Sequence, residues 1–182
     1  VLDYAERVSI ILQLRVAGNE TTTKLINETV KLLIENPDQF QRIKDDPSTI
    51  PDMVEEALRL SSPNQGLFRV VQKDVELDDV KVSAGSTLWV MFGAANRDER
   101  HFPEPDRFDP TRENLRDHIA FGKGAHFCIG APLARLEAKV CFALLAERIA
   151  HWEFAPGNTF EYEPSYILRG LKNLELDIKK AS

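Results

Sequence analysis

Long apolar runs, clustered cysteines and an excess of basic charge are absent from this sequence of 182 residues. No apolar run approaches the roughly 20 residues that a helix needs to cross a bilayer, so we expect no membrane association. Two cysteines at unrelated positions make no disulfide framework, which favours a reducing, cytoplasmic location. A net charge of -6 argues against nucleic acid as a partner, because phosphate binding needs a basic face. The remaining balance, 43% hydrophobic and 29% charged, is typical of one soluble globular domain.

The order of the patterns predicts a mainly α fold with a small β region. Apolar residues at helical spacing and Pro or Ser stops predict helices over residues 2–35, 37–46, 51–60 and 132–149. Short runs of β-type composition predict strands at residues 67–71, 75–77, 80–82 and 87–90. Alternation around Leu174, Leu176 and Ile178 predicts a terminal hairpin.

Two of the predicted helices have notable apolar surfaces. Residues 8–18 are apolar on nearly every face, which is normal for a central helix buried on several sides. The residues that would cover those faces are hard to find in 182 positions, so we interpret the chain as a piece of a longer protein. The last predicted helix is amphipathic, with one apolar face formed by Leu133, Leu136, Val140 and Leu144.

One cysteine lies in a glycine-rich loop directly before the last helix, in the segment Phe121-Gly122-Lys123-Gly124-Ala125-His126-Phe127-Cys128-Ile129-Gly130. Glycines let the backbone fold tightly and approach a flat ligand closely. The start of a helix offers unpaired N–H groups and a partial positive charge, which stabilise a thiolate. A thiolate in an apolar loop is a suitable axial ligand for haem iron. The alternatives are a buried, inert cysteine, or a zinc site with His126 that would lack further ligands.

A glycine and two threonines occur in the middle of the first helix, where their propensity is poor, in the hexapeptide Ala17-Gly18-Asn19-Glu20-Thr21-Thr22. Glycine removes a side chain, so a ligand can approach the backbone. A threonine hydroxyl that bonds a backbone carbonyl can loosen the helix locally. Glu20 beside Thr21 places an acid next to an alcohol, a pair that can relay protons. A solvated patch on an ordinary helix is the alternative interpretation.

Several charged residues are further candidates. Glu56 and Arg59 lie three residues apart on one helix face, although most such pairs are exposed and contribute little. Glu55 is the alternative acid, but its spacing to Arg59 differs. Arg69 occupies a predicted strand, where a charge needs a partner. Histidines outside the cysteine loop are expected on the surface, and the second cysteine in the core: His101, His118, His151 and Cys141.

The cysteine loop matches Phe-x-x-Gly-x-His-x-Cys-x-Gly and resembles the cysteine-ligand loop of the haem-thiolate monooxygenases, the cytochrome P-450 superfamily. The hexapeptide around Gly18 is similar to that family's distal oxygen-activation motif, and Glu56 with Arg59 to its Glu-x-x-Arg signature. The resemblance covers essentially the whole chain. It implies that residues 1–182 are the C-terminal haem-binding half of a soluble, bacterial-type member, from the distal long helix to the terminal hairpin.

The resemblance also implies a cofactor and its contacts. The cofactor would be haem b, iron protoporphyrin IX, with Cys128 as the metal ligand. Haem-binding residues would be Ala17, Gly18, Arg69, Phe121, Gly124, His126, Cys128 and Gly130. Arg69 and His126 would bind the haem carboxylates. Glu20 and Thr21 would be catalytic, delivering protons to bound dioxygen. A buried structural cluster beneath the haem would consist of Glu56, Arg59 and Arg107.

The implied activity is the insertion of one oxygen atom of dioxygen into an apolar organic substrate. Electrons would come from a ferredoxin or flavodoxin. Residues for both haem faces are present, but much of the pocket wall is not, so we do not expect activity from this chain alone. One alternative keeps the haem for peroxygenation or rearrangement, against which the Glu20–Thr21 pair argues. Another is a non-catalytic chain without haem that is ordered only by self-association.

Overall fold

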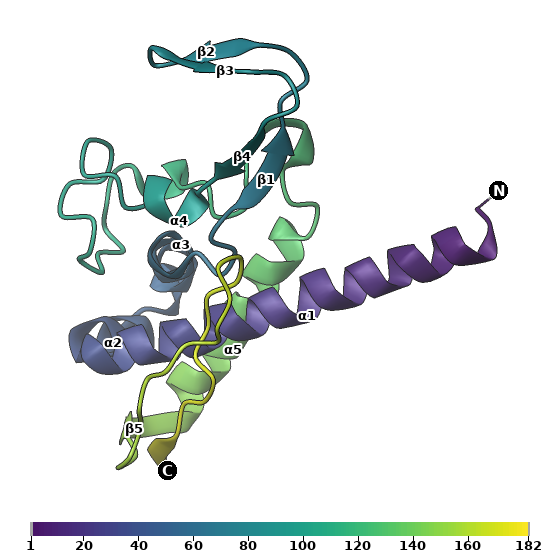
Figure 1. Ribbon diagram of the computed structural model, residues 1–182. Helices are drawn as coiled ribbons and strands as arrows, with labels where there is room; N and C mark the ends of the chain where they lie inside the picture. The colour runs from purple at the N-terminus through teal and green to yellow at the C-terminus, as the bar shows by residue number, and fades with distance from the viewer. Residues whose placement is uncertain (1, 182) are drawn as a thin grey trace.

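The computed structural model describes residues 2–181, and its longest element is a helix that extends well beyond the body of the molecule (Figure 1). This helix, α1, spans Tyr4–Glu35. Asp3 and Glu6 cap its N-terminus through reciprocal hydrogen bonds between side chain and backbone, both 2.8 Å long. At its other end the Asn36 side chain donates to the carbonyl of Leu32 at 2.8 Å. The helix predicted over residues 2–35 is confirmed.

The other elements follow the predicted order. The further helices are α2 (Pro37–Asp45), α3 (Ile50–Ser61), α4 (Phe92–Ala95) and α5 (Ala131–Arg148). Short 3-10 turns occur at Pro47–Thr49, Leu115–Asp117 and Gly124–His126. Strands form antiparallel pairs, β1 (Leu67–Val70) with β4 (Thr87–Val90), β2 (Val75–Leu77) with β3 (Val80–Val82), and β5 (Ile149–Phe154) with β6 (Leu176–Lys180). The mainly helical fold with a small β region is confirmed.

The C-terminal strand pair differs from the prediction in its first strand. Residues 149–154 form β5, which sequence patterns did not reveal, and its partner β6 follows only after the loop over residues 155–175. Trp152 lies opposite Ile178 in this pair. Its ring stacks on Phe40 of α2 with centroids 4.3 Å apart. The strand therefore depends on packing against α2, a contact that no local pattern reports.

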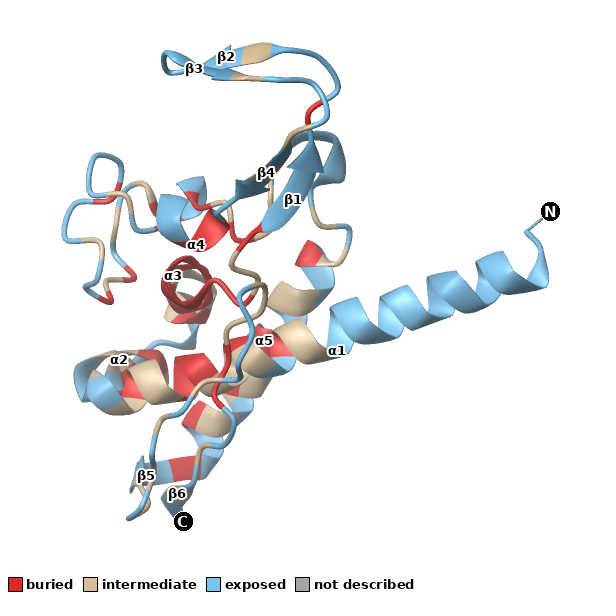
Figure 2. Ribbon diagram, viewed as in Figure 1, coloured by how far each residue is buried: buried red, intermediate tan, exposed pale blue. Residues whose placement is uncertain are grey.

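The hydrophobic core lies where α1, α3 and α5 meet, and α2 extends it by packing on α1 and α5 (Figure 2). Helix α3 is buried along almost its whole length, including its charged residues at positions 55, 56 and 59. The same core cluster contains fully buried apolar side chains from the other helices, among them Leu25, Leu33, Ile43 and Phe142. Charges inside such a core require paired partners, and those partners define the candidate site below.

Burial changes sharply along α1 (Figure 2). Residues 2–19 are exposed, with Ile11 65% and Leu14 64% accessible, whereas buried positions begin at Thr22. Helix α5 also leaves an apolar face uncovered, formed by Leu133, Leu136, Val140 and Leu144. Its packed face consists of Ala131, Ala138, Phe142 and Ala146. The prediction of a single apolar face on α5 is wrong, because the small alanines let this helix pack closely on the other side.

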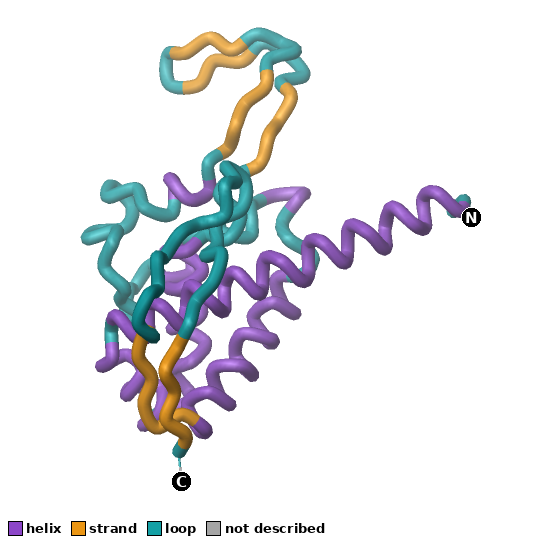
Figure 3. The backbone as a smooth tube through the Cα atoms, turned by 60° about the horizontal axis from the view of Figure 1, so that its bottom comes forward, coloured by secondary structure: helices purple, strands orange, loops and turns teal. Residues whose placement is uncertain are grey.

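The loop over residues 155–175 runs across α1 toward β1 (Figure 3). Its Tyr162 hydroxyl donates to Glu28 of α1 at 3.3 Å, and its Ile167 carbonyl accepts from Gln65 at 2.7 Å. Burial raises the pKa of Glu28. The loop thus ties the middle of α1 to the segment that enters β1.

None of the helices in residues 2–181 combines the length and the apolar character needed to cross a membrane.

Candidate functional site

The Cys128 loop is closed by backbone hydrogen bonds at the start of α5. The Cys128 N–H donates to the Phe121 carbonyl at 3.0 Å, and the Cys128 carbonyl accepts from Ala131 at 3.2 Å. Gly122 and Gly124 have φ of +71° and +78°, where other residues are strained. Gly124, the first glycine of the motif, and Gly122 beside it are therefore backbone requirements. They fix the sulfur just ahead of the first turn of α5.

The surface around Cys128 is open and apolar. The cysteine is free and half-buried, while Ile129 is 94% and Phe127 51% exposed. A Cβ built on Gly124 would meet no atom within 4 Å. Within residues 2–181, no group of three or more His, Cys, Asp or Glu side chains is placed to hold a metal ion. A soft sulfur on an apolar, uncovered surface fits a large flat cofactor that brings its own metal, and the residues here fit a haem.

Arg69 and His126 are both exposed, so both side chains are accessible to an anionic ligand. Arg69 lies on β1, where its guanidinium donates to the neighbouring Phe68 carbonyl at 2.9 Å. In the part of the chain that the structure describes, no carboxylate forms an ion pair with it. Arginine binds carboxylates with two parallel hydrogen bonds, so the carboxylates of a haem suit this side chain.

Two threonine hydroxyls bond the α1 backbone at this point, Thr21 within the hexapeptide and Thr23 just after it. The Thr21 hydroxyl donates to the Ala17 carbonyl at 2.7 Å, and the Thr23 hydroxyl donates to Asn19 at 2.8 Å. Such bonds compete with the helical ladder and can loosen it. Glu20 is turned away, since its carboxylate pairs with Lys24 at 3.4 Å. The structure therefore leaves Glu20 and Thr21 without a direct hydrogen bond between them.

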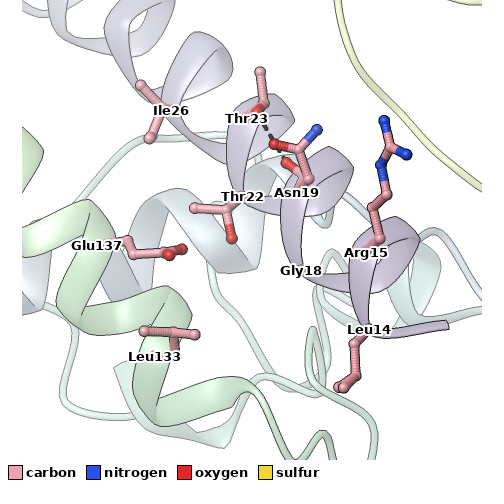
Figure 4. A pocket seen from close by; sticks show the side chains of 9 residues that line it. All are labelled: Leu14, Arg15, Gly18, Asn19, Thr22, Thr23, Ile26, Leu133 and Glu137. Atoms are coloured by element: carbon pink, nitrogen blue, oxygen red, sulfur yellow. Dashed lines mark hydrogen bonds between the residues drawn. The ribbon is translucent and has the colours of Figure 1, made fainter. Parts of the chain in front are cut away.

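An open pocket of about 650 Å³ lies between α1 and α5 (Figure 4). Gly18 and Thr22 line it from α1, opposite Leu133 and Glu137 of α5. Among the predicted site residues only Gly18 contributes to the lining, and Cys128 does not. We therefore assign the pocket to the uncovered apolar faces of the two helices rather than to the cysteine site.

The predicted pair of Glu56 and Arg59 is fully buried. Two guanidinium nitrogens of Arg59 donate to the two Glu56 oxygens, both at 2.8 Å. A third donates to the carbonyls of Asn96 at 2.8 Å and Pro105 at 2.7 Å. This pair is therefore more than a solvated helix pair, because it holds two loops against the base of α3.

Arg112, and not Arg107, completes this cluster. The Arg112 guanidinium donates to Glu56 at 3.0 Å, and its side chain is almost fully buried. Arg107 contributes its backbone carbonyl, which accepts from Arg59 at 3.2 Å and Arg112 at 2.9 Å. With its carbonyl directed inward, the Arg107 side chain lies in solvent and pairs with Glu104. The prediction for Arg107 is wrong for this reason.

A second buried cluster surrounds Glu55, which sequence reasoning set aside. Arg135 donates to its carboxylate at 2.6 and 2.8 Å, and His118 lies 3.0 Å from it. Burial favours the neutral form of Glu55, but the hydrogen bonds from Arg135 and His118 outweigh it and lower the pKa to about 2. The surface prediction is therefore wrong for His118, whereas His101 and His151 are exposed as predicted.

The Glu55 cluster and the burial of Cys141 both differ from what the sequence predicted. No fixed spacing links positions 55, 118 and 135, so the second cluster had no motif in the sequence. Cys141, expected in the core, is only half-buried on α5, and that burial raises the pKa of its thiol. The burial of α3 along its length is what indicates a partner for Glu55, because an unpaired carboxylate in a buried position would be costly.

Several known proteins are similar to this chain in sequence and in structure. The cytochrome P-450 family profile matches residues 2–166. Cytochrome P-450 107B1 of Saccharopolyspora erythraea is 43% identical over 175 residues, which are 95% of this chain and 43% of that protein. The structure of CYP109Q5 from Chondromyces apiculatus matches with a TM-score of 0.92 at 42% identity, covering 100% of this chain and 46% of that one.

A third match is CYP109E1 from Bacillus megaterium, solved in complex with corticosterone. It has a TM-score of 0.91 at 40% identity and covers 98% of this chain and 48% of that one. The chain thus spans less than half the length of each of these relatives. The glycine-held Cys128 loop, the buried Glu56–Arg59 pair and the matched profile lead to one assignment. The chain belongs to the cytochrome P-450 family.

Proposed function

We propose that residues 1–182 are the C-terminal haem-binding portion of a cytochrome P-450 monooxygenase with haem b as its cofactor. The observation that carries this proposal is the Cys128 loop, whose sulfur lies at the start of α5 on an open apolar surface. When bound, the haem would supply the activation of dioxygen and the transfer of one oxygen atom to the substrate. Cys128 would hold the haem iron through its thiolate sulfur.

The loop and β1 would hold the cofactor in place. Gly124 and Gly130 let the loop backbone approach a flat ring, and Phe121 anchors the loop by accepting the Cys128 N–H. Arg69 and His126 would bind the two carboxylates. On the opposite side, Ala17 and Gly18 would leave room for dioxygen, because neither presents a bulky side chain.

Thr21 and Glu20 would move protons on the α1 side. The Thr21 hydroxyl donates its proton to the Ala17 carbonyl, so its oxygen lone pairs remain available to accept a hydrogen bond from a water or a ligand. Glu20 would exchange protons with solvent, since its side chain is partly exposed. For that role its carboxylate must leave Lys24, a surface ion pair of small energy.

The proposal also covers the substrate and the electron donor. We propose a small apolar organic substrate, in keeping with the corticosterone complex of the Bacillus megaterium relative. The electron donor would be a ferredoxin or flavodoxin, and the location cytoplasmic.

The exposed first half of α1 favours a second candidate, a chain that binds no haem and is ordered by self-association.

Replacing Cys128 with His tests the proposal. The haem-loaded protein, reduced and exposed to carbon monoxide, should show the absorption band of a thiolate-ligated haem. Cys128→His should remove that band, because imidazole is a weaker electron donor to iron than thiolate. Cys141→Ala on α5 is the matched control and should keep it. Survival of the thiolate band in Cys128→His would disprove the ligand assignment.

A further inference from the structure

Glu55 contacts residues on both sides of the cysteine loop. His118 precedes the loop, Arg135 follows it in α5, and Cys128 lies between them. Both contacts reach one carboxylate on α3, which is 2% exposed. A single buried group therefore bridges the two ends of the segment that carries the sulfur.

The hydrogen-bond roles around Glu55 can be assigned. The Ala120 N–H donates to His118 Nδ1 at 3.3 Å, so that nitrogen is the acceptor and Nε2 carries the proton. His118 Nε2 therefore donates to Glu55 at 3.0 Å. Arg135 donates through two nitrogens, at 2.6 and 2.8 Å. Charge-assisted bonds of this kind are short and directional, so they fix positions as well as charge.

Arg135 reaches the loop a second way. Its guanidinium lies over the Phe121 ring, 4.6 Å from the ring centroid. The Phe121 carbonyl in turn accepts the Cys128 N–H at 3.0 Å. A continuous path of contacts therefore runs from Glu55 through Arg135 and Phe121 to Cys128. Glu56, the next residue on α3, belongs to the separate cluster with Arg59 and Arg112.

We propose that Glu55 is a positioning residue for Cys128, which holds both ends of the cysteine loop through His118 and Arg135. This inference rests on the proposed haem-thiolate function. Neutralising the carboxylate removes the charge that fixes Arg135, so the loop end and the Phe121 contact become free to shift. The sulfur then ligates the haem in only part of the molecules.

The test compares Glu55→Gln with Asp52→Asn in the haem-loaded protein. Asp52 lies on the same helix and pairs at the surface with Arg116, at 2.8 Å, and Arg116 also lies 3.9 Å from Glu55. Asp52→Asn therefore removes a neighbouring carboxylate but keeps the bonds of Glu55 to His118 and Arg135, which makes it the matched control. We expect Glu55→Gln to lose part of the thiolate-type carbon monoxide band, and Asp52→Asn to keep it. Arg135→Gln, at a more exposed site, should reproduce the loss and serves if Glu55→Gln does not fold.

A second readout needs no haem. Hydrogen exchange of the Phe127 and Cys128 amides, both bonded within the loop, should accelerate in Glu55→Gln relative to amides of the β5–β6 pair. Lower thermal stability with unchanged band and unchanged loop exchange would overturn the proposal and leave Glu55 a merely structural group. If the unsubstituted protein shows no thiolate band, the proposed function fails, and loop exchange alone decides whether Glu55 holds the loop.

Discussion

At the scale of single residues, neighbouring carboxylates on α3 have different partners. Glu55 bonds Arg135 and His118, whereas Glu56 bonds Arg59 and Arg112. Both side chains are buried, so each depends on its own cations for satisfaction. The Glu56 cluster attaches the loop that contains Pro105 and Arg112 to α3, and the Glu55 cluster attaches His118 and the α5 residue Arg135 to the same helix.

Arg112 should matter far more than Arg107 for stability. Arg112→Ala leaves a Glu56 oxygen and the Arg107 carbonyl with fewer donors in a buried site, and we expect a loss of about 3–5 kcal/mol. Arg107→Ala removes an exposed ion pair and should cost less than about 1 kcal/mol. Unfolding in urea, followed by far-ultraviolet circular dichroism, measures both. Equal losses would contradict the placement of Arg112.

At the scale of elements, α1 combines a well-capped exposed half with a buried half, and the threonines lie where the two meet. Thr21 and Thr23 each donate to a carbonyl one turn back, with nearly equal distances of 2.7 and 2.8 Å. Removing either hydroxyl should therefore change the local loosening of the helix to a similar extent. A proton-transfer role should belong to Thr21 alone.

In the longer, haem-loaded enzyme of which we propose residues 1–182 to be the C-terminal portion, Thr21→Ala should uncouple electron consumption from product formation, with Thr23→Ala as its control. We expect Thr21→Ala to consume reductant and dioxygen but to release hydrogen peroxide in place of product, because the hydroxyl that passes protons is missing. Thr23→Ala removes the same kind of local bond and should leave product formation coupled to electron consumption. Product and peroxide are measured per electron consumed. Unchanged coupling in Thr21→Ala would remove Thr21 from the relay.

At the scale of the whole molecule, the exposed apolar surfaces of α1 and α5 are the main destabilising feature. Covering apolar area contributes roughly 25 cal/mol per Å², so several uncovered large side chains amount to several kcal/mol. A domain's total stability is about 5–15 kcal/mol. The relatives named above are more than twice as long as this chain.

The purified chain should therefore self-associate through the first half of α1. Ile11→Glu with Leu14→Lys places charges on the exposed apolar surface and should shift the chain toward monomer. Ser9→Glu with Gln13→Lys makes the same charge change at polar positions and should leave association unchanged. Sedimentation velocity measures the mass of each form. A compact monomer of the unsubstituted chain with tightly bound haem would show that the exposed helix is tolerated.

The sequence by itself determined most of the elements and the cysteine loop, because both depend on local chemistry. Helical spacing defined α1, and glycines with positive φ are required wherever the loop turns tightly, so their positions are visible in the sequence. Glu56 and Arg59 were found because they lie on one turn of one helix.

Only the tertiary structure decided the partners that lie far apart in the chain. It replaced Arg107 by Arg112, buried His118 beside Glu55, and paired β6 with a strand that no local pattern predicted. It also showed that α5 packs through its alanines and Phe142 and leaves Leu133, Leu136 and Leu144 exposed. The physical reason is common to all four. A buried charge, a strand edge or a helix face is satisfied by whatever the fold brings near it, and sequence spacing does not encode that proximity.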